Sequence, residues 1–374
     1  MRVLLLGAGA SQHACYPLAS ELLTKVDEHV SASALVNIRQ AWRGWLDFRD
    51  SCPEYLQFVV RNNNPEIVFT LPTLLQVAAD AEDSYRTSSA FKEAEVLGAE
   101  EPAAKLKTYY DSSPRDFLSR AKVGLAHLLH TLDWYFLEHH VEDAHYQTRR
   151  DPLRQLLEQL DAGDVIITLN WDTTAERTLA ELNKWSPLEG YGFAKMLVLR
   201  SPKGSDSAVP PEAATSRVKV LKLHGSFGWY VNGDEVVFEN ASYLDAFHFH
   251  IDGRPANLAD PQFTVSTYAG DHFLVTPSFI KNLTHPILQN IWHTALGALA
   301  RASTVDVWGY SLPDADGAAR ALFLSLKTQV GRGETRVTIH DPGTPTRERW
   351  RSLLGTQVRT VNESLGTRCS VAAE

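Results

Sequence analysis

Three short motifs, far apart in the chain, carry residue types from which a nucleotide site with its own chemistry could be built. They are Gly7-Ala8-Gly9-Ala10-Ser11, Thr168-Leu169-Asn170-Trp171-Asp172 and Leu223-His224-Gly225-Ser226. The first is a loop of small residues, the second holds an amide near a carboxylate, and the third holds an imidazole. Such groups can bind phosphates, position a hydroxyl or a water molecule, and accept a proton.

The glycine motif is suited to an anion. Small residues allow backbone N–H groups to approach a pyrophosphate, and the N-terminus of a following helix favours negative charge. Gly7 and Gly9 supply conformational freedom, and Ser11 can donate a hydrogen bond. The same pattern also forms plain tight turns, and a dehydrogenase fingerprint needs a third glycine where this chain has Gln12. We therefore expect a nucleotide here and do not favour hydride transfer.

The polar residues of the other two motifs each allow two interpretations. Asn170 can hold a water or a ribose hydroxyl, and Asp172 can orient a neighbour or offset positive charge. Equally, both can form an Asx-type turn that caps the next helix. His224 lies between a strand and Gly225, a position suited to a general base, although single histidines are more often structural. The residues alone leave these alternatives open.

The motifs depend on the strands that precede them. Buried strands are predicted at Arg2–Leu6, Val165–Ile167 and Val218–Leu223, and further strands at Met196–Leu199, Thr304–Trp308 and Arg336–His340. Helices are predicted between them at Thr174–Asn183, Pro286–Ala302 and Asp316–Leu326, and a hairpin is predicted around Asn232-Gly233. Strands that alternate with helices predict an α/β fold with a doubly wound, mostly parallel Rossmann-like sheet. Ligands of such sheets bind beyond the carboxyl ends of the strands, where all three motifs fall.

A large helical insertion interrupts this pattern. Apolar residues repeat at three- and four-residue spacing from Phe117 to Phe136, and helices are also predicted at Pro17–Val30, Ala34–Phe48 and Thr70–Ala81. We expect residues 31–150 to form a mainly helical insertion. Residues 1–30 and 151–374 then form one discontinuous nucleotide-binding and catalytic domain.

Composition excludes several classes of function. The 374 residues carry a formal net charge of −9, which argues against direct binding of nucleic acid, because phosphate neutralisation needs clustered Lys and Arg. No apolar run reaches about 18 residues, so we expect no membrane span. The first strand begins at Arg2, which leaves no room for a signal peptide, and we expect a cytoplasmic protein. The histidine pairs, such as His248 with His250, lack acidic or cysteine partners at ligand spacing, so no metal is expected.

The motifs, in this order, resemble the sirtuin-like NAD-consuming superfamily. GAGAS is similar to its phosphate loop, TLNWD to its T-x-N-x-D segment and LHGSFG to its H-G-S segment. The run Trp308–Asp316 is similar to the G-Y-S-L-x-x-x-D segment of bacterial sirtuin-like proteins, and Pro277, Lys281 and Trp292 fit the same pattern. The resemblance covers roughly residues 1–25 and 160–345.

Two departures separate the chain from the protein deacylases of that superfamily. Their zinc ribbon of two cysteine pairs is replaced by the Asn232-Gly233 hairpin, and their G-I-P-D-F-R segment by Cys15–Ala19. A deacylase is therefore disfavoured. The pattern instead resembles the sirtuin-like NAD hydrolases of bacterial antiphage defence.

That resemblance implies cleavage of NAD, as substrate, to nicotinamide and ADP-ribose, without a metal. It implies Asn170 and Asp172 as positioning groups and His224 as the base. The implied NAD-binding residues are Gly7, Ala8, Gly9, Ala10, Ser11, Thr168, Gly309, Ser311 and Asp341, of which Ser311 and Asp341 would contact the adenosine ribose.

The resemblance also implies control by assembly, since a constantly active NAD hydrolase would kill its host. We expect a homo-oligomer, a partner protein such as a hexameric ATPase or an Argonaute, or both. The alternative is a non-catalytic subunit of a defence complex that senses NAD or ADP-ribose, because binding and cleavage use the same loop.

Overall fold

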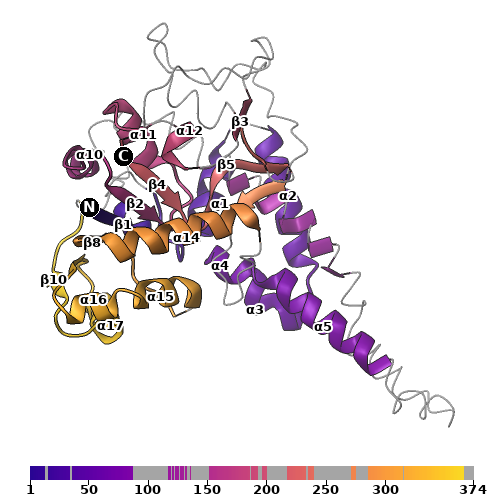
Figure 1. Cartoon of the computed structure of the whole chain (residues 1–374). Helices are drawn as coiled ribbons and strands as arrows, with labels where there is room; N and C mark the ends of the chain where they lie inside the picture. Colours follow the sequence, from indigo (N-terminus) through magenta and orange to yellow (C-terminus); the bar gives the residue numbers. More distant parts are fainter. Residues whose placement is uncertain are drawn as a thin grey trace, which may run out of the picture. The chain divides into compact units, whose positions relative to one another are not determined.

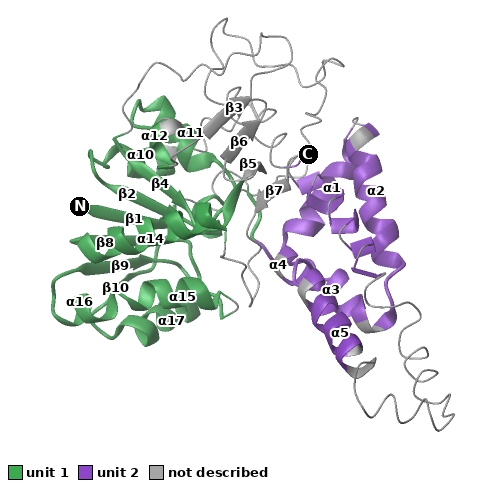
Figure 2. Ribbon diagram, turned by 45° about the vertical axis from the view of Figure 1, so that its right-hand side comes forward, with its two compact units in different colours: residues 1–18, 136–374 green, residues 19–135 purple. Residues whose placement is uncertain are grey.

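A computed structural model shows how the chain folds (Figure 1). The residues it describes are 1–12, 16–33, 36–86, helical positions within 117–135, 151–185, 187–192, 196–199, 217–232, 235–239, 271–274, 285–314 and 316–365. The chain divides into two compact units, residues 1–18 with 136–374 and residues 19–135 (Figure 2). The sequence predicted this division at residues 30 and 150. The first unit keeps the opening strand and its glycine loop, and the helix that follows them belongs to the second unit.

The first unit is built on a six-stranded sheet in which every neighbouring pair is parallel. Its order is β10 (Arg359–Val361), β9 (Arg336–His340), β8 (Thr304–Trp308), β1 (Arg2–Leu6), β2 (Val165–Thr168) and β4 (Lys219–Lys222). From β1 the chain builds β2 and β4 on one side and later β8, β9 and β10 on the other. The strand order therefore reverses between β1 and β8, the kind of point at which open α/β sheets bind ligands.

Helices of the same unit flank the sheet, which confirms the predicted α/β Rossmann-like fold (Figure 1). They are α10 (Asp151–Glu158), α11 (Thr174–Glu181), α12 (Pro187–Gly190), α14 (Pro286–Arg301), α15 (Gly317–Leu324), α16 (Lys327–Gly331) and α17 (Thr344–Leu354). In α14, Pro286 occupies the first turn and the His285 side chain caps the Ile287 N–H. Its buried residues Leu288, Ile291, Ala295, Ala298 and Leu299 recur at three- and four-residue spacing, as an amphipathic helix requires.

The central strands show why the sheet forms where the sequence predicts it. All four side chains of β2 are buried, as are the last four of β1. Central parallel strands are covered on both faces, so continuous Val, Ile and Leu runs are typical of them. These strands make up most of the core of the unit.

A second, four-stranded sheet has the order β3 (Met196–Leu199), β6 (Glu235–Glu239), β5 (Gly225–Asn232) and β7 (Asp271–Leu274). Strands β5 and β6 are antiparallel, with Asn232 opposite Glu235, which confirms the predicted hairpin. The Met196–Leu199 run is a strand as predicted, but it pairs with β6 and not with the main sheet. Local β-propensity cannot distinguish these partners.

The described part of the second unit is helical. It contains α1 (Leu22–Ala32), α2 (Val36–Asp50), the short η3 (Glu54–Leu56), α3 (Gln57–Val60), α4 (Pro65–Val68) and α5 (Leu71–Arg86). Described positions between 117 and 135 are helical too. Its core combines aliphatic side chains with an aromatic group, in which Phe48 packs between Trp45 and Phe117 at ring-centroid distances of 5.8 Å.

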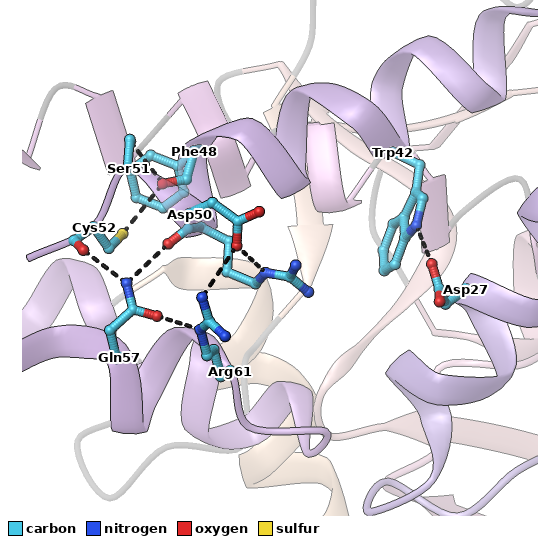
Figure 3. A network of polar contacts seen from close by, with 9 residues as sticks. Asp27, Trp42, Phe48, Asp50, Ser51, Cys52, Gln57 and Arg61 are labelled. Carbon is cyan, nitrogen blue, oxygen red and sulfur yellow. Dashed lines mark hydrogen bonds and ion pairs between the residues drawn. The ribbon is translucent and has the colours of Figure 1, made fainter. Parts of the chain in front are cut away.

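Polar contacts of the second unit tie its helices together near the surface (Figure 3). The Trp42 indole donates to Asp27 at 2.6 Å and links α2 to α1. After α2, the Gln57 amide donates to the Cys52 carbonyl oxygen at 2.7 Å. Burial raises the pKa of the Cys52 thiol to about 11, despite the opposing charge of Arg120. This thiol is therefore protonated at neutral pH and poorly nucleophilic.

None of the helices in the described ranges combines the length and the apolar character that crossing a membrane would require.

Candidate functional site

The three motifs lie at the carboxyl end of the main sheet, as the sequence predicted. The glycine loop follows β1, TLNWD ends β2, and His224 comes two residues after β4. Strands β1, β2 and β4 are consecutive neighbours, so these loops share one edge. The segment after β8, which begins at Gly309, lies next to the glycine loop on the other side of the reversal point.

The glycine loop packs backbone to backbone against Gly309. Gly7 N–H donates to the Trp308 carbonyl oxygen at 3.0 Å, and Gly9 N–H donates to that of Gly309 at 2.9 Å. A Cβ at Gly7 would lie 2.5 Å from the Tyr310 Cα, and one at Gly309, where φ is +64°, would lie 2.2 Å from the Ala10 nitrogen. These glycines are required because two loops touch.

This packing corrects the predicted role of the loop amides. The N–H groups of Gly7, Gly9, Ala10 and Ser11 all donate to carbonyl oxygens of the protein, so they do not point together at an anion. The predicted helix behind the loop also begins late. Residues Ala8–Ala10 form a short 3-10 helix and α1 begins at Leu22, not at Pro17. Ala8 is exposed and Ala10 is buried.

Asn170 joins the glycine loop to TLNWD. Its Nδ2 donates to the Gly7 carbonyl oxygen and to Ser11 Oγ, both at 3.0 Å, and its backbone N–H donates to Thr168 Oγ1 at 3.1 Å. Both amide hydrogens therefore anchor the side chain, and the carbonyl oxygen Oδ1 is the atom that can accept a hydrogen bond from a bound hydroxyl or water.

Asp172 fits both interpretations of its motif at once. Its Oδ1 accepts from the Thr174 N–H at 2.9 Å, the Asx-type turn that begins α11. Its Oδ2 accepts from Ser11 Oγ at 2.9 Å. Ser11 thereby lies between the Asn170 amide and the Asp172 carboxylate. The structure brings these three predicted residues into one hydrogen-bonded cluster, which we call the Asn170 cluster.

A buried ion pair contacts the Asn170 cluster through the backbone of Asp172. Lys222 Nζ lies 2.8 Å from Glu176 Oε1, and the two side chains are 0% and 1% exposed. The same ammonium donates to the Asp172 carbonyl oxygen, and Tyr191 donates to Glu176 Oε1 at 3.0 Å. Sequence analysis missed this pair, although a lysine beside the apolar residues Val220 and Leu221 in a predicted buried strand was a signal for it.

A small pocket opens beside the Asn170 cluster. Asn170, Asp172, Ser11, Thr168 and Glu176 line its polar side, and Leu6, Ala10, Leu153 and Ala175 line its apolar side. It has room for about one water molecule, far less than a dinucleotide needs. Its polar lining suits a single water or hydroxyl group.

His224 belongs to a second cluster. Its Nε2 lies 3.3 Å from Asp316 Oδ2, and both side chains are almost fully buried. Tyr310 donates to the same oxygen at 3.0 Å, while Asp316 Oδ1 accepts from the Ala319 N–H and caps α15. A carboxylate in this position fixes which imidazole nitrogen carries the proton.

Asp316 is a further site residue that sequence analysis missed. It was placed only at the beginning of a helix, within the Trp308–Asp316 motif. The contact forms because the segment that follows β8 extends past the ends of β1 and β2 to reach the edge strand β4. Two residues of that segment, Gly309 and Leu312, have positive φ, which shapes its path. Such a route is set by packing and has no local pattern.

The remaining predicted NAD-binding residues lie elsewhere along this edge. Ser311 is exposed, and its carbonyl oxygen accepts from Arg349 at 2.8 Å. Asp341 is half-buried, and its Oδ1 accepts from the Gly343 N–H at 2.7 Å. Both contacts involve α17 or the turn before it, so in the described chain the structure does not join Ser311 or Asp341 to the Asn170 cluster.

Another polar group lies within the strands β1, β8 and β9. Arg2 Nε lies 2.8 Å from Asp306 Oδ2, and the Trp308 and His340 rings stack at 3.9 Å. Burial opposes ionisation of Asp306, but a hydrogen bond from His340 and the charge of Arg2 outweigh it, so the pKa of Asp306 lies below its ordinary value. This group stabilises the sheet.

Several sequence predictions concern residues that the structure does not describe, including Pro277, Lys281 and the pair His248 with His250. Trp292 is described, and its indole donates to the Leu223 carbonyl oxygen at 3.1 Å. Within the described residues, no three His, Cys, Asp or Glu side chains gather as a metal site would require. That the protein works without a metal stays a prediction.

Comparison with protein-family models finds none that matches this chain, and comparison with curated proteins finds none that is similar to it.

Proposed function

We propose that this protein cleaves the bond between nicotinamide and ribose in NAD and releases nicotinamide and ADP-ribose. The observation that carries the proposal is the Asn170 cluster, in which an amide, a hydroxyl and a carboxylate gather beside a water-sized pocket at the carboxyl end of a parallel sheet. The His224–Asp316 pair at the same end supplies a group that can accept a proton. The motif resemblance to sirtuin-like NAD hydrolases supports the same chemistry.

In the proposed reaction, the C1′–N bond breaks and its electron pair leaves with nicotinamide. Positive charge develops on the ribose, as in an oxocarbenium ion. A water oxygen then forms a bond to C1′, and the proton lost from that water passes to His224. The products are nicotinamide and ADP-ribose, so atoms and charge balance without a further reactant.

The side chains have separate parts in this scheme. Asn170 Oδ1 accepts a hydrogen bond from the attacking water or a ribose hydroxyl. Asp172, held by Ser11, places a negative charge near the developing positive charge. Asp316 orients His224 and favours the imidazolium that forms when it takes the proton. Proton transfer to a positioned base contributes roughly 10²-fold to 10⁴-fold to a rate.

A second candidate is a non-catalytic subunit that binds NAD or ADP-ribose. The observation that favours it is the internal bonding of the glycine loop. The N–H groups of Gly7, Gly9, Ala10 and Ser11 and the Asn170 Nδ2 already donate to other protein groups. A site whose donors hold its own loops together suits a sensor as well as an enzyme.

Regulation and location are proposed from the motif resemblance alone. We propose a cytoplasmic effector of bacterial antiphage defence that stays inactive until it assembles. Assembly would occur with further copies of this chain, with a partner such as a hexameric ATPase or an Argonaute, or with both.

The test follows nicotinamide and ADP-ribose release by wild-type protein, Asn170→Ala and Asn170→Asp over a range of protein concentrations. Asn290→Ala, on the exposed face of α14, is the matched control. We expect wild type and the control to cleave NAD, with a rate that rises steeply with concentration. Both Asn170 variants should lose roughly 10²-fold or more.

NAD binding, measured by calorimetry, separates the two candidates. Wild type that binds NAD and releases no product at any concentration, alone or with its host's proteins, is a sensor. An Asn170→Ala protein that is folded and cleaves at the wild-type rate contradicts the proposed reaction.

A further inference from the structure

Helix α11 carries a buried arginine whose charge has no partner in the described part of the chain. Arg177 is only 7% exposed, and its Nε is shielded from solvent without a hydrogen-bond partner. A guanidinium keeps its charge at physiological pH. Burying such a charge is strongly unfavourable unless a negative group compensates it.

The acidic residues close to Arg177 in sequence are committed to other partners. Glu176 pairs with Lys222 and accepts from Tyr191. Glu181 pairs with Arg154 on α10. The Asp172 carboxylate holds Ser11 and the Thr174 N–H. The compensating group must therefore come from elsewhere.

Thr174, about one helical turn before Arg177, also has a buried polar atom without a hydrogen-bond partner in the described part of the chain. Its side chain is 1% exposed, and its hydroxyl oxygen is also shielded without a hydrogen-bond partner. Residues three apart on a helix share a face, so Thr174 and Arg177 project from the same side of α11. Thr174 is also the first residue of α11, where the helix dipole favours a negative charge.

We propose that the first two turns of α11 bind a phosphate group through Arg177 and Thr174. A planar guanidinium and a hydroxyl supply hydrogen-bond donors that a phosphate accepts, and the first turn of the helix adds positive potential. The site lies immediately after Asn170 and Asp172 in the chain. It does not depend on cleavage of NAD, and its phosphate is either free or part of a nucleotide.

The test compares wild type, Arg177→Met and Thr174→Val in phosphate-free buffer. Thermal unfolding without ligand is measured first, and titrations with inorganic phosphate, ADP-ribose and adenosine follow. Arg154→Met, which removes an exposed and paired arginine, is the matched control. Arg177→Lys retains the positive charge but lacks the planar guanidinium, and it replaces Arg177→Met in the comparison if that variant does not fold.

We expect Arg177→Met to unfold at the wild-type temperature or above, because it removes an uncompensated buried charge. Its affinity for the phosphate ligand should fall at least about tenfold, with a smaller loss for Thr174→Val and none for the control. Binding of inorganic phosphate identifies a free anion as the ligand, whereas binding of ADP-ribose alone identifies a nucleotide phosphate.

Three results would overturn the proposal. One is wild-type protein that binds neither inorganic phosphate nor ADP-ribose. Another is adenosine binding as tight as that of ADP-ribose, which would leave the phosphate without a role. The third is full affinity in a folded Arg177→Met or Arg177→Lys protein. Because every readout is binding or unfolding, these results are independent of whether the protein cleaves NAD.

Discussion

The two units of the chain differ in whether they bury polar and charged side chains. The first unit buries Lys222, Glu176, Arg177, His224 and Asp316, whereas Thr131 is the only buried polar residue in the described part of the second unit. Its hydroxyl donates to the His127 carbonyl oxygen within its own helix. Burying charge costs free energy that apolar packing does not. The groups that the proposed reaction uses therefore belong to the first unit, whereas the described core of the second unit is almost entirely apolar.

One ion pair from each unit illustrates this difference in burial. Lys222 and Glu176 are 2.8 Å apart and almost entirely shielded from solvent. Arg61 and Asp50 in the second unit are 3.5 Å apart, and both are more than half exposed. A buried pair is strongly coupled because solvent does not screen it, whereas an exposed pair contributes about 0–1 kcal/mol. The same residue types thus have different consequences in the two units.

The largest expected effect comes from breaking the buried pair. Lys222→Met leaves Glu176 charged and unpaired within the core, so the free energy of unfolding should fall by about 3–5 kcal/mol. Urea denaturation followed by fluorescence measures this change. Lys222→Met combined with Glu176→Leu should recover much of the loss, because no uncompensated charge remains.

The exposed pair of Arg61 with Asp50 provides the comparison for the Lys222→Met variant. Arg61→Ala in the second unit should change the free energy of unfolding by less than about 1 kcal/mol. Equal losses for Lys222→Met and Arg61→Ala would refute the contrast between the units.

Asp316→Asn is expected to have a medium effect on the rate of NAD cleavage. This variant removes the carboxylate that orients His224 but leaves the fold intact. Asparagine still caps α15, so the unfolding midpoint should change little. Loss of the carboxylate beside Nε2 should lower NAD cleavage at least about tenfold, or ~1.4 kcal/mol, and change the pH dependence of the rate. Nitrogen NMR of the His224 ring should show a changed tautomer balance.

These readouts separate two kinds of failure. An unchanged His224 spectrum would remove Asp316 from its positioning role. If Asp316→Asn changes the spectrum while wild-type protein itself does not cleave NAD, the pairing is confirmed and the proposed reaction is contradicted.

A smaller effect than that of Lys222→Met is expected at Asp306, whose partly exposed pair with Arg2 is intermediate between the buried and the exposed ion pair. Its pKa in the folded protein lies below the ordinary value of 3.8, so ionised Asp306 stabilises the fold. That contribution is complete above the ordinary pKa and is lost as pH falls through the lower folded value. Asp306→Asn should cost about 1–2 kcal/mol at pH 7.

Denaturation of both proteins between pH 7 and pH 2 provides the check. The difference between wild type and Asp306→Asn should shrink as pH falls below about 4, where the wild-type carboxyl also becomes neutral. A difference that grows in acid would reverse the assigned direction of the shift.

Much of the candidate site follows from the sequence. Asn170, Asp172 and Ser11 were predicted to lie at the carboxyl ends of parallel strands in one nucleotide site. They form one cluster because the loops that carry them leave the same end of adjacent strands. The Asx-type turn at Asp172 was also among the predicted alternatives. It coexists with the bond to Ser11 because a carboxylate has two oxygen atoms.

Other features could not be read from local pattern. Gly7 and Gly9 suggested a phosphate loop, but their small size is required by contact with Gly309, which is distant in the chain. The partner of His224 is likewise a residue beyond another strand. The predicted helix after the glycine loop begins late, since amphipathic spacing extended toward Pro17 without a capping residue to mark its start.

The sequence by itself determined the strands and helices that have a clear apolar pattern, such as β1, β2, β8, β9 and α14, and that the polar motifs lie at one end of a parallel sheet. Periodicity and side-chain shape act over a few residues, so they can be read directly. Only the tertiary structure decided which polar groups meet, such as Asp316 with His224, and which stay uncompensated, such as Arg177. Those outcomes depend on the path of the whole chain, because burial and pairing are properties of the packed molecule.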